Sequence, residues 1–504
     1  MNLSYVIDRA ARYFANKPAL VFGRRAYSYG ELWGAVSRIA SHLLAEGLRP
    51  GDRVALYVPN SPEWVAAYYG VIRAGGVVLC LNPAYKRFEI EHLLRDSRSC
   101  LMIASDRLAQ HVPDPATIPR LDAVLSVESH PVFSTIFEGT CSEPPPVSVH
   151  TEADDPCVIL YTGGTTGTPK GAMLTHKNIL FTSQNVCYHE RIRIDDISLG
   201  FMPLNHVFGG NHIMNGTFYG CGTLVLHEGF DYDRILESIH EDRVTRFFAV
   251  PTVFIRLMAH SRYKQYFSTV NYCFSAATSM ASEIVRKWSE MYGLTIHEAY
   301  GMTETSSLVT YNHMYRHKIG SVGTAAGIVE VRIIDPDGNP VAQGEKGEIA
   351  IRGPNVMKGY LNKPDETAAV LQDGWLRSGD VGRIDEDGYL FIVDRIKDVI
   401  ITGGYNVFPS EVEEVLYTHP SISECAVVGV EHPVYGEAVT AFVVFREGFD
   451  VPSTELTVYC KDRLASYKVP KQFNPVSELP KSSTGKILRR MVREPKSDSG
   501  GEVT

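Results

Sequence analysis

The chain has 504 residues, 44% hydrophobic and 21% charged, a composition typical of a soluble globular protein large enough for several hydrophobic cores. Its 49 Lys and Arg residues stand against 58 Asp and Glu residues, which gives a net charge of −9. An acidic chain is a poor candidate for sequence-independent binding to nucleic acid or an anionic membrane, and we expect no nucleic-acid partner.

The nine cysteines are odd in number and scattered, and no C-x-x-C pair occurs among them. This pattern argues against a disulfide framework and against a zinc ribbon. The first residues, MNLSYVIDRAARYF, carry charges where a signal peptide needs an apolar run. No stretch reaches about 18 consecutive apolar residues, so we expect no integral membrane span and a cytoplasmic location.

The first 150 residues alternate helical and strand patterns. Apolar residues at three- and four-residue spacing predict a helix over 29–46, and a second helix is expected over 62–74. Short apolar runs predict strands over 53–58 and 77–81. Strands that alternate with helices indicate a parallel sheet covered on both faces.

A proline-rich stretch over 141–156 predicts a surface crossing, because Pro144 to Pro146 fit neither a helix nor a central strand. The pattern resumes with a buried strand over 157–161, which leads into a Gly/Thr loop, and α/β alternation continues to about residue 330. Short strands in 331–394, separated by Asp-Gly turns at 337–338 and 387–388, predict a small antiparallel sheet or barrel.

The remaining segment has the length of a separate small domain. It is expected to contain helices over 409–418 and 453–465 and strands over 424–430 and 438–445. The predicted fold is therefore α/β. A large N-terminal domain over 1–394 combines α/β subdomains with a small β-barrel-like subdomain. A small mobile α+β domain over 395–494 and a disordered tail over 495–504 follow.

The loop Tyr161-Thr-Gly-Gly-Thr-Thr-Gly-Thr-Pro-Lys-Gly171 carries the strongest chemical signal. Its glycines allow backbone N–H groups to point at one place, its threonines add hydroxyl donors, and Lys170 adds a positive charge. These groups suit a polyphosphate. The loop is not a Walker A motif, because Lys170 follows Pro169 rather than a glycine.

Four further segments follow that loop in order. They are Tyr300-Gly-Met-Thr-Glu-Thr305, Gly374-Trp-Leu-Arg-Ser-Gly-Asp380, Asp394-Arg-Ile-Lys-Asp398 with Gly403-Gly-Tyr-Asn-Val-Phe-Pro409, and Pro480-Lys-Ser-Ser-Thr-Gly-Lys486. The ordered set closely resembles the adenylate-forming superfamily of acyl-CoA synthetases, peptide-synthetase adenylation domains and luciferases, most closely the fatty-acid-type acyl-CoA ligases. The resemblance implies that a carboxylate attacks MgATP to give acyl-AMP and pyrophosphate, and that a thiol, here CoA, then displaces AMP.

The same resemblance implies the roles of individual residues. Lys486 matches the catalytic lysine of the first step, Glu304 matches the magnesium carboxylate, and Thr303 matches a hydroxyl near the α-phosphate. Asp380 matches the carboxylate that binds the ribose, Arg395 matches a further ribose or phosphate contact, and Tyr300 matches an aromatic face against adenine. The other expected ATP- and AMP-binding residues are Thr162, Gly163, Gly164, Thr165, Thr166, Gly167, Lys170, Ser275, Ala276, Ala277, Glu298, Ala299, Gly301 and Met302.

The C-terminal domain of the family rotates between the two steps, which assigns further residues by resemblance. Lys397 falls at the hinge position, and Gly403 with Gly404 matches the loop that lines the CoA pantetheine tunnel. The context of Lys486 also resembles lysines that are acetylated in relatives, so a lysine acetyltransferase is an expected partner. A homodimer is a further expectation.

On the acyl side, the segment Pro203-Leu-Asn-His-Val-Phe-Gly-Gly210 resembles the lining of the acyl pocket. His206 is placed beside the carboxylate, and Val207, Phe208 and Val250 are expected to line the pocket. The segment has His206 and no Asp, which disfavours amino acids as substrates. A monocarboxylic, largely apolar acid (fatty, alicyclic or aromatic) is therefore the expected substrate.

Several departures from the family leave the substrate and the activity open. Gly163 replaces a common serine, and Ser275 to Ser279 depart from the usual S-G-G-A-P turn. Gly353 to Tyr360 resemble malonyl-CoA synthetases, but Asn271 stands where those enzymes place an arginine, so a dicarboxylate is less favoured. The same fold could also serve a stand-alone enzyme that loads a carrier protein, a luciferase-like oxygenase or a non-catalytic ligand-binding relative.

Overall fold

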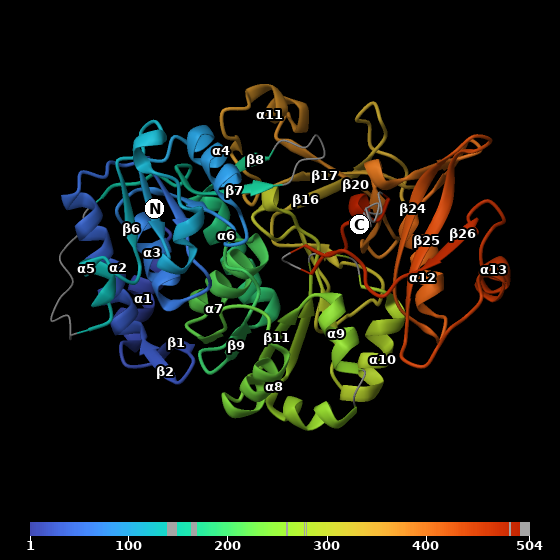
Figure 1. Cartoon of the computed structure of the whole chain (residues 1–504), viewed down its shortest axis with the longest axis horizontal. Helices are drawn as coiled ribbons and strands as arrows, with labels where there is room; N and C mark the ends of the chain where they lie inside the picture. The colour runs from blue at the N-terminus through green and yellow to red at the C-terminus, as the bar shows by residue number, and fades with distance from the viewer. Residues whose placement is uncertain are drawn as a thin grey trace, which may run out of the picture.

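A computed structural model describes residues 1–138, 149–162, 169–258, 261–276, 278, 280–482 and 485–493. Two large mixed sheets flanked by helices form the N-terminal part, and a small domain with its own sheet ends the chain (Figure 1). Pro144 to Pro146 of the predicted crossing over 141–156, and the predicted tail at 495–504, lie outside the described residues. In the described part, no helix is long and apolar enough to cross a membrane.

The first large sheet has the strand order β18-β8-β7-β4-β3-β5-β6. Its central strands are parallel, as the helix–strand alternation predicts, but β8 runs antiparallel to β7, and β18 runs antiparallel to β8. The purely parallel expectation is therefore wrong at this edge, because a hairpin and not a crossover helix follows β7. The strands are β3 (Arg53–Tyr57), β4 (Val77–Cys80), β5 (Leu101–Ala104), β6 (Ala123–Ser126), β7 (Pro156–Thr162), β8 (Lys170–Thr175) and β18 (Gly359–Tyr360).

The second large sheet has the order β13-β12-β11-β9-β10-β1-β2. The first hairpin of the chain, β1–β2, does not join the first sheet, although the strands that come next in the sequence do. Its strand β1 pairs with β10, which lies some two hundred residues later. The strands are β1 (Pro18–Phe22), β2 (Arg25–Ser28), β9 (Ile197–Gly200), β10 (Thr223–Leu226), β11 (Arg246–Ala249), β12 (Tyr272–Ser275) and β13 (Ile296–Glu298).

Helices pack on both large sheets, and one hydrophobic cluster extends through them. The predicted helices over 29–46 and 62–74 are confirmed as α2 and α3, each with a serine side chain that caps its first turn. The α-helices of this part are α1 (Tyr5–Phe14), α2 (Tyr29–Ala45), α3 (Pro62–Arg73), α4 (Arg87–Ser97), α5 (Pro131–Ser134), α6 (His176–Glu190), α7 (Gly216–Tyr219), α8 (Tyr232–Glu241), α9 (Pro251–Met258) and α10 (Ser282–Tyr292). A π-helix over Phe208–Asn215 precedes α7, and the short helices are Asp106–His111, Pro115–Thr117, Ser261–Thr269 and Thr303–Thr305.

A smaller antiparallel sheet follows, as the Asp-Gly turns predict. Gly338 and Gly388 in those turns have φ values of +89° and +84°. The sheet comprises β16 (Glu330–Ile334), β17 (Gly347–Arg352), β19 (Leu371–Gln372), β20 (Trp375–Ile384) and β21 (Leu390–Arg395). The nearby pair β14 (Thr310–Tyr311) with β15 (Thr324–Ala325), and helix α11 (Pro364–Val370), complete this region.

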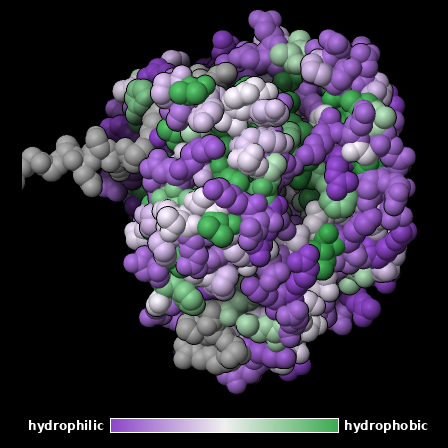
Figure 2. Space-filling model, turned by 90° about the vertical axis from the view of Figure 1, so that its right-hand side faces the viewer, coloured by the Kyte–Doolittle hydropathy of each residue, from purple (hydrophilic) through white to green (hydrophobic). Residues whose placement is uncertain are grey.

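The C-terminal domain has its own hydrophobic core around β24 and β25, which supports the expectation of a separate unit. The helix expected over 453–465 is present but shorter, and it ends at Lys461. The elements are β22 (Ile400–Thr402), β23 (Tyr405–Val407), α12 (Pro409–Tyr417), β24 (Ile422–His432), β25 (Gly436–Phe445), α13 (Ser453–Lys461), β26 (Gln472–Pro475) and α14 (Arg489–Arg493). The face on this side of the molecule is mostly hydrophilic, with hydrophobic residues scattered over it (Figure 2).

Candidate active site

A cavity of about 760 Å³ lies where the two large sheets, the small sheet and the C-terminal segment meet. The β7–β8 hairpin contributes Thr162 and Lys170, whose Cα atoms are partners in the ladder. The loops that follow the parallel strands β12 and β13 contribute Ala276, Ala299 and the stretch Gly301–Glu304. Loops at the carboxyl ends of neighbouring parallel strands are the usual place for a ligand crevice in an open α/β sheet.

Residues far apart in the sequence meet in this cavity. Those predicted for the site that line it are Thr162, Lys170, His206, Val207, Phe208, Ala276, Ala299, Gly301, Met302, Thr303, Glu304, Asp380, Arg395, Lys397 and Lys486. Loop residues Gly163, Gly164, Thr165, Thr166 and Gly167, together with Ala277, lie outside the described residues.

The carboxylate of Asp380 connects two neighbours in the cavity wall. The hydroxyl of Tyr300 donates to Asp380 Oδ2 at 2.6 Å, and Arg395 Nε lies 3.3 Å from Asp380 Oδ1. Burial, and then the adjacent Asp380 charge, raise the pKa of Tyr300, so its hydroxyl stays a donor. Tyr300 supports Asp380 from behind, because its buried side chain is not among the described residues that line the cavity.

A second acidic position lies at Glu304, in the 3₁₀ turn Thr303–Thr305. Tyr360 on β18 donates its hydroxyl to Glu304 Oε1 at 2.8 Å, and the Lys170 ammonium lies 5.3 Å from the centre of the Tyr360 ring. Burial, and then the Glu304 charge, raise the pKa of Tyr360. A carboxylate that lines the cavity fits Mg²⁺, because this ion is usually bound by one or two carboxylates together with substrate phosphates.

The basic side chains of His206 and Lys486 both line the first cavity and interact electrostatically. Burial, and then the Arg395 charge, lower the pKa of Lys486 to about 8, although the Asp380 charge opposes the shift. Burial, and then the Lys486 charge, lower the pKa of His206 to about 4, so its imidazole is neutral at pH 7. The backbone N–H of Phe208 donates to His206 Nδ1 at 3.2 Å, which leaves the ring proton on Nε2.

Three other predicted residues do not line this cavity. Glu298 and Ser275 are buried neighbours on β13 and β12. The Glu298 pKa rises to about 8 because of burial, while a hydrogen bond from the backbone of Met280 opposes the rise. Val250 is placed in a second cavity, where a Cβ on Gly485 would lie 2.8 Å from Val250 Cγ2.

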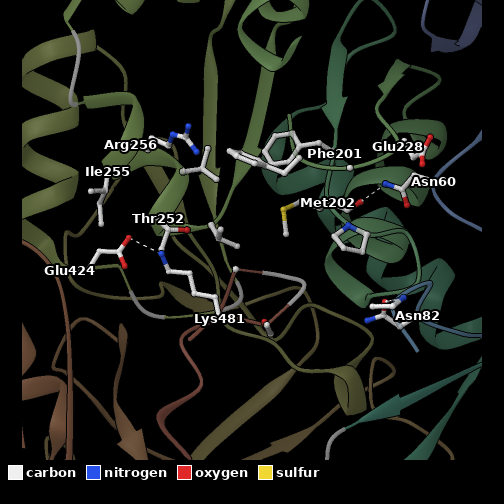
Figure 3. Close-up of a pocket in the computed structure, with 18 of the residues that line it drawn as sticks. Asn60, Asn82, Phe201, Met202, Glu228, Thr252, Ile255, Arg256, Glu424 and Lys481 are labelled. Atoms are coloured by element: carbon white, nitrogen blue, oxygen red, sulfur yellow. Dashed lines mark hydrogen bonds and ion pairs between the residues drawn. The ribbon is translucent and has the colours of Figure 1, made fainter. Parts of the chain in front are cut away.

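The second cavity, of about 1260 Å³, lies between the N-terminal part and the C-terminal domain (Figure 3). Phe201 and Met202 form an apolar wall on one side of this cavity, and Arg256 adds a positive charge to its lining. On the side of the C-terminal domain, Lys481 Nζ contacts Glu424 Oε1 at 2.8 Å. This cavity combines apolar surface with charged groups at a domain boundary, a common position for ligand sites.

Gly403 and Gly404 are placed outside both cavities, in the exposed turn between β22 and β23. Their φ values of +56° and +82° suit glycine. In this arrangement the C-terminal domain therefore presents Lys486, and not its glycine turn, to the first cavity.

Sequence reasoning missed several residues of the site. Tyr360, Ser378 and His212 line the first cavity, and Arg489 holds the segment that carries Lys486. Tyr360 could have been found, because it ends the segment from Gly353 that resembles malonyl-CoA synthetases. Arg489 carries no local signal, because its partners lie far away in the sequence.

Comparison with known proteins identifies the family. Residues 7–361 match the AMP-binding enzyme family, and residues 411–486 match the AMP-binding enzyme C-terminal domain. The chain belongs to the AMP-binding enzyme family, the adenylate-forming superfamily that the motif order predicts.

Particular relatives cover nearly the whole chain. A feruloyl-CoA synthase of an Amycolatopsis species is 38% identical over 489 residues, which is 96% of this chain and 97% of that protein. A long-chain-fatty-acid–CoA ligase of Bacillus subtilis strain 168 is 36% identical over 98% of this chain and 94% of that protein. The crystal structure of ATP-bound MatB from Rhodopseudomonas palustris has a TM-score of 0.90 at 33% identity and covers 99% of both chains.

Proposed function

We propose that this chain is an AMP-forming carboxylate–CoA ligase that acts on a monocarboxylic, largely apolar acid. The acid reacts with ATP to give acyl-AMP and pyrophosphate, and CoA then displaces AMP to give the acyl-CoA thioester. One observation carries the proposal. A single cavity contains groups suited to phosphate, ribose and carboxylate, and these groups come from five separate motifs.

In the first step, a carboxylate oxygen of the acid attacks the α-phosphorus, and the bond to the bridging oxygen of pyrophosphate breaks. The ammonium of Lys486 stabilises the negative charge that develops around the α-phosphate. The neutral imidazole of His206 donates its Nε2–H to the acid or to the acyl phosphate, because Nδ1 is occupied by the Phe208 N–H. Thr303 offers a hydroxyl at the same wall.

Asp380 is proposed to bind the ribose. A carboxylate accepts from both hydroxyls of a ribose, and the Tyr300 hydroxyl and Arg395 fix its orientation. Positioning of this kind contributes by holding the α-phosphorus in line with the attacking oxygen.

The phosphates of ATP are proposed to lie along the β7–β8 hairpin. Lys170 and Thr162 stand at the base of the loop, and Glu304 would hold Mg²⁺ together with the phosphate oxygens. The bound Mg²⁺ would neutralise phosphate charge.

The second step is proposed to use the boundary between the domains. The second cavity has the size and the mixed lining that an entering CoA needs, and Lys481 and Arg256 supply positive charge for its phosphates. The glycine turn at Gly403–Gly404 is outside this cavity as well, so its proposed role at the pantetheine requires a rotation of the C-terminal domain about Lys397. Such a rotation gives one small domain a different part in each half-reaction.

The substrate class follows from the apolar lining and from the relatives. Val207, Phe208 and Phe274 line the first cavity near His206. Feruloyl and long-chain fatty acids are named for relatives of the chain, and both are monocarboxylic and largely apolar.

The test is a release assay for pyrophosphate and AMP with ATP, Mg²⁺ and a panel of fatty, alicyclic, aromatic and dicarboxylic acids, each with and without CoA. We expect pyrophosphate with at least one monocarboxylic acid, and stoichiometric AMP and acyl-CoA when CoA is present. A phosphopantetheinyl carrier protein in place of CoA is the matched alternative acceptor. Thioester on that protein alone would contradict the CoA assignment, and no pyrophosphate with any acid would contradict the activity.

A further inference from the structure

A buried histidine that the proposed mechanism does not use lies in the wall of the first cavity. His212 is only 2% exposed and belongs to the π-helix Phe208–Asn215. Its ring stacks on Phe274, with ring centres 4.5 Å apart, and its Nε2 lies 2.6 Å from Glu190 Oε1. π-helical turns occur often at functional sites, because they re-aim side chains that an α-helix would place elsewhere.

The π-helix itself depends on close backbone approach. A Cβ on Gly209 would lie 2.1 Å from the carbonyl oxygen of Pro203, so only glycine fits this position. The close approach brings the start of the helix against the segment that carries His206. His206 and His212 therefore stand on one continuous stretch, the first beside Lys486 and the second six residues further along.

Glu190 is fixed from the side away from the cavity. It is fully buried at the end of α6, and Arg246 Nη1 lies 3.6 Å from its Oε2. Arg246 Nη2 also donates to the backbone carbonyl of Glu190 at 2.8 Å, and Arg246 Nε lies 2.8 Å from Asp196 Oδ2. A buried network of this kind fixes side-chain orientation, and here it fixes the His212 ring.

Because His212 Nε2 is hydrogen-bonded to Glu190, Nδ1 is the ring nitrogen of His212 that can contact a ligand. Its neighbour is the Ser307 hydroxyl, 3.5 Å away, and Ser307 also lines the cavity. Around these two polar groups the wall is apolar and aromatic, formed by Val207, Phe208 and Phe274. A few placed polar groups in an apolar wall are the usual arrangement for recognition of one substituent on an apolar ligand.

We propose that the acid is an aromatic carboxylic acid with a ring hydroxyl, which His212 Nδ1 and Ser307 bind while Phe208 and Phe274 pack against the ring. This inference rests on the proposed ligase function and deepens it. An alkyl chain would leave His212 Nδ1 and the Ser307 hydroxyl only their long contact of 3.5 Å with each other, whereas a ring hydroxyl can form a hydrogen bond with both. A second carboxylate placed beside His212 could not use Arg246 as a partner, because Glu190 and Asp196 already engage that guanidinium behind the ring.

The experiment compares kcat/KM for pyrophosphate release between matched acids. The panel pairs cinnamic and benzoic acids with their ring-hydroxylated derivatives and adds octanoic and succinic acids. For the wild-type enzyme we expect a preference of about tenfold or more for the best hydroxylated acid over its parent acid, the size of one well-placed hydrogen bond. Octanoic and succinic acids should be poorer than that hydroxylated acid.

His212→Phe keeps an aromatic ring and should reduce the preference for the hydroxyl to about one. Since this change strands the Glu190 carboxylate, the double variant His212→Phe/Glu190→Gln and the single variant Ser307→Ala, which leaves the buried network intact, are measured beside it. Both should lower the preference. His189→Phe is the matched control, because His189 also stacks on an aromatic ring, that of Tyr311, but does not line the cavity among the described residues. Its preference should equal that of the wild type.

The outcomes separate this inference from the ligase function. Equal kcat/KM for hydroxylated and parent acids, or a preference that survives in both the double variant and Ser307→Ala, overturns the inference. So does a higher kcat/KM for octanoic or succinic acid, although acyl-CoA formation from either acid would leave the ligase function standing. An enzyme that releases no pyrophosphate with any acid overturns the proposed function and this inference together.

Discussion

The alkaline limit of adenylation should follow the protonation of Lys486. Its ammonium is the active form in the proposed first step, and burial lowers its pKa from 10.5 to about 8, with Arg395 as the next cause. The value of kcat/KM should therefore reach its maximum well below pH 8, be about half of it at pH 8 and fall further above that pH. At pH 9 about one enzyme molecule in ten keeps the proton, so kcat/KM should drop about tenfold.

The decrease of kcat/KM can be measured between pH 6 and pH 10 as pyrophosphate release at low concentrations of acid and ATP. The corresponding decrease of kcat should occur at higher pH, because the negative charge of bound ATP near Lys486 raises the pKa of Lys486 in the complex. Lys486→Ala should lose adenylation, and it should keep the formation of acyl-CoA from acyl-AMP supplied directly. A kcat/KM that stays flat to pH 10, or a variant that loses both half-reactions equally, would refute the reasoning.

The remaining predictions concern stability and ligand binding. Arg489→Met should destabilise the protein by about 3–5 kcal/mol in urea unfolding, because it leaves the buried Asp394 and the partly buried Glu413 without their cationic partner, and an unchanged midpoint would contradict this. Asp380→Asn should raise the KM for ATP about tenfold with the melting temperature unchanged, through the loss of a charged hydrogen bond. Glu304→Gln should raise the Mg²⁺ concentration needed for half-maximal rate at fixed ATP, and equal Mg²⁺ titrations would count against it. Ser28→Ala should cost about 1 kcal/mol of unfolding free energy, because it removes the cap of α2.

Local patterns were sufficient to predict elements whose signals are local. The helices α2 and α3 combine amphipathic spacing with capping serines, and the Asp-Gly turns fix the hairpins of the small sheet. Many of the motif residues meet in the first cavity, because most of them lie in loops or at the ends of elements, although Asp380 lies within β20. Elements that converge on one crevice bring such positions together.

Long-range pairing could not be predicted in the same way. Nothing in the first 30 residues indicates that β1 pairs with β10, because that choice depends on which sheet edge is open after the rest has folded. The pair His212–Glu190 is invisible for a related reason. The two residues lie 22 positions apart on different helices, and only the packing of the π-helix against α6 makes them neighbours.

The contacts that hold the C-terminal domain in place have unequal strength, which bears on its proposed rotation. Arg489 joins Asp394, before Lys397, to Glu413 on α12, through bonds of 2.9 Å and 2.7 Å. This network lies close to Lys397, so a rotation about that residue would displace its members only slightly. It also ties the segment of Lys486 to the domain that would move.

Two other contacts between α12 and the N-terminal domain are weaker. Lys346 pairs with Glu411 at 2.7 Å on the surface, a kind of ion pair that contributes about 0–1 kcal/mol. Glu414 accepts from the backbone N–H of Ser282 at 3.1 Å, a cap at the start of α10 that contributes about 1 kcal/mol. Contacts of this size can be exchanged for others without a large barrier. A strong network beside the hinge, where Arg489 also lies 3.5 Å from Asp398, combined with weak contacts elsewhere on α12, is what a domain needs if it is to turn as one body and carry Lys486 with it.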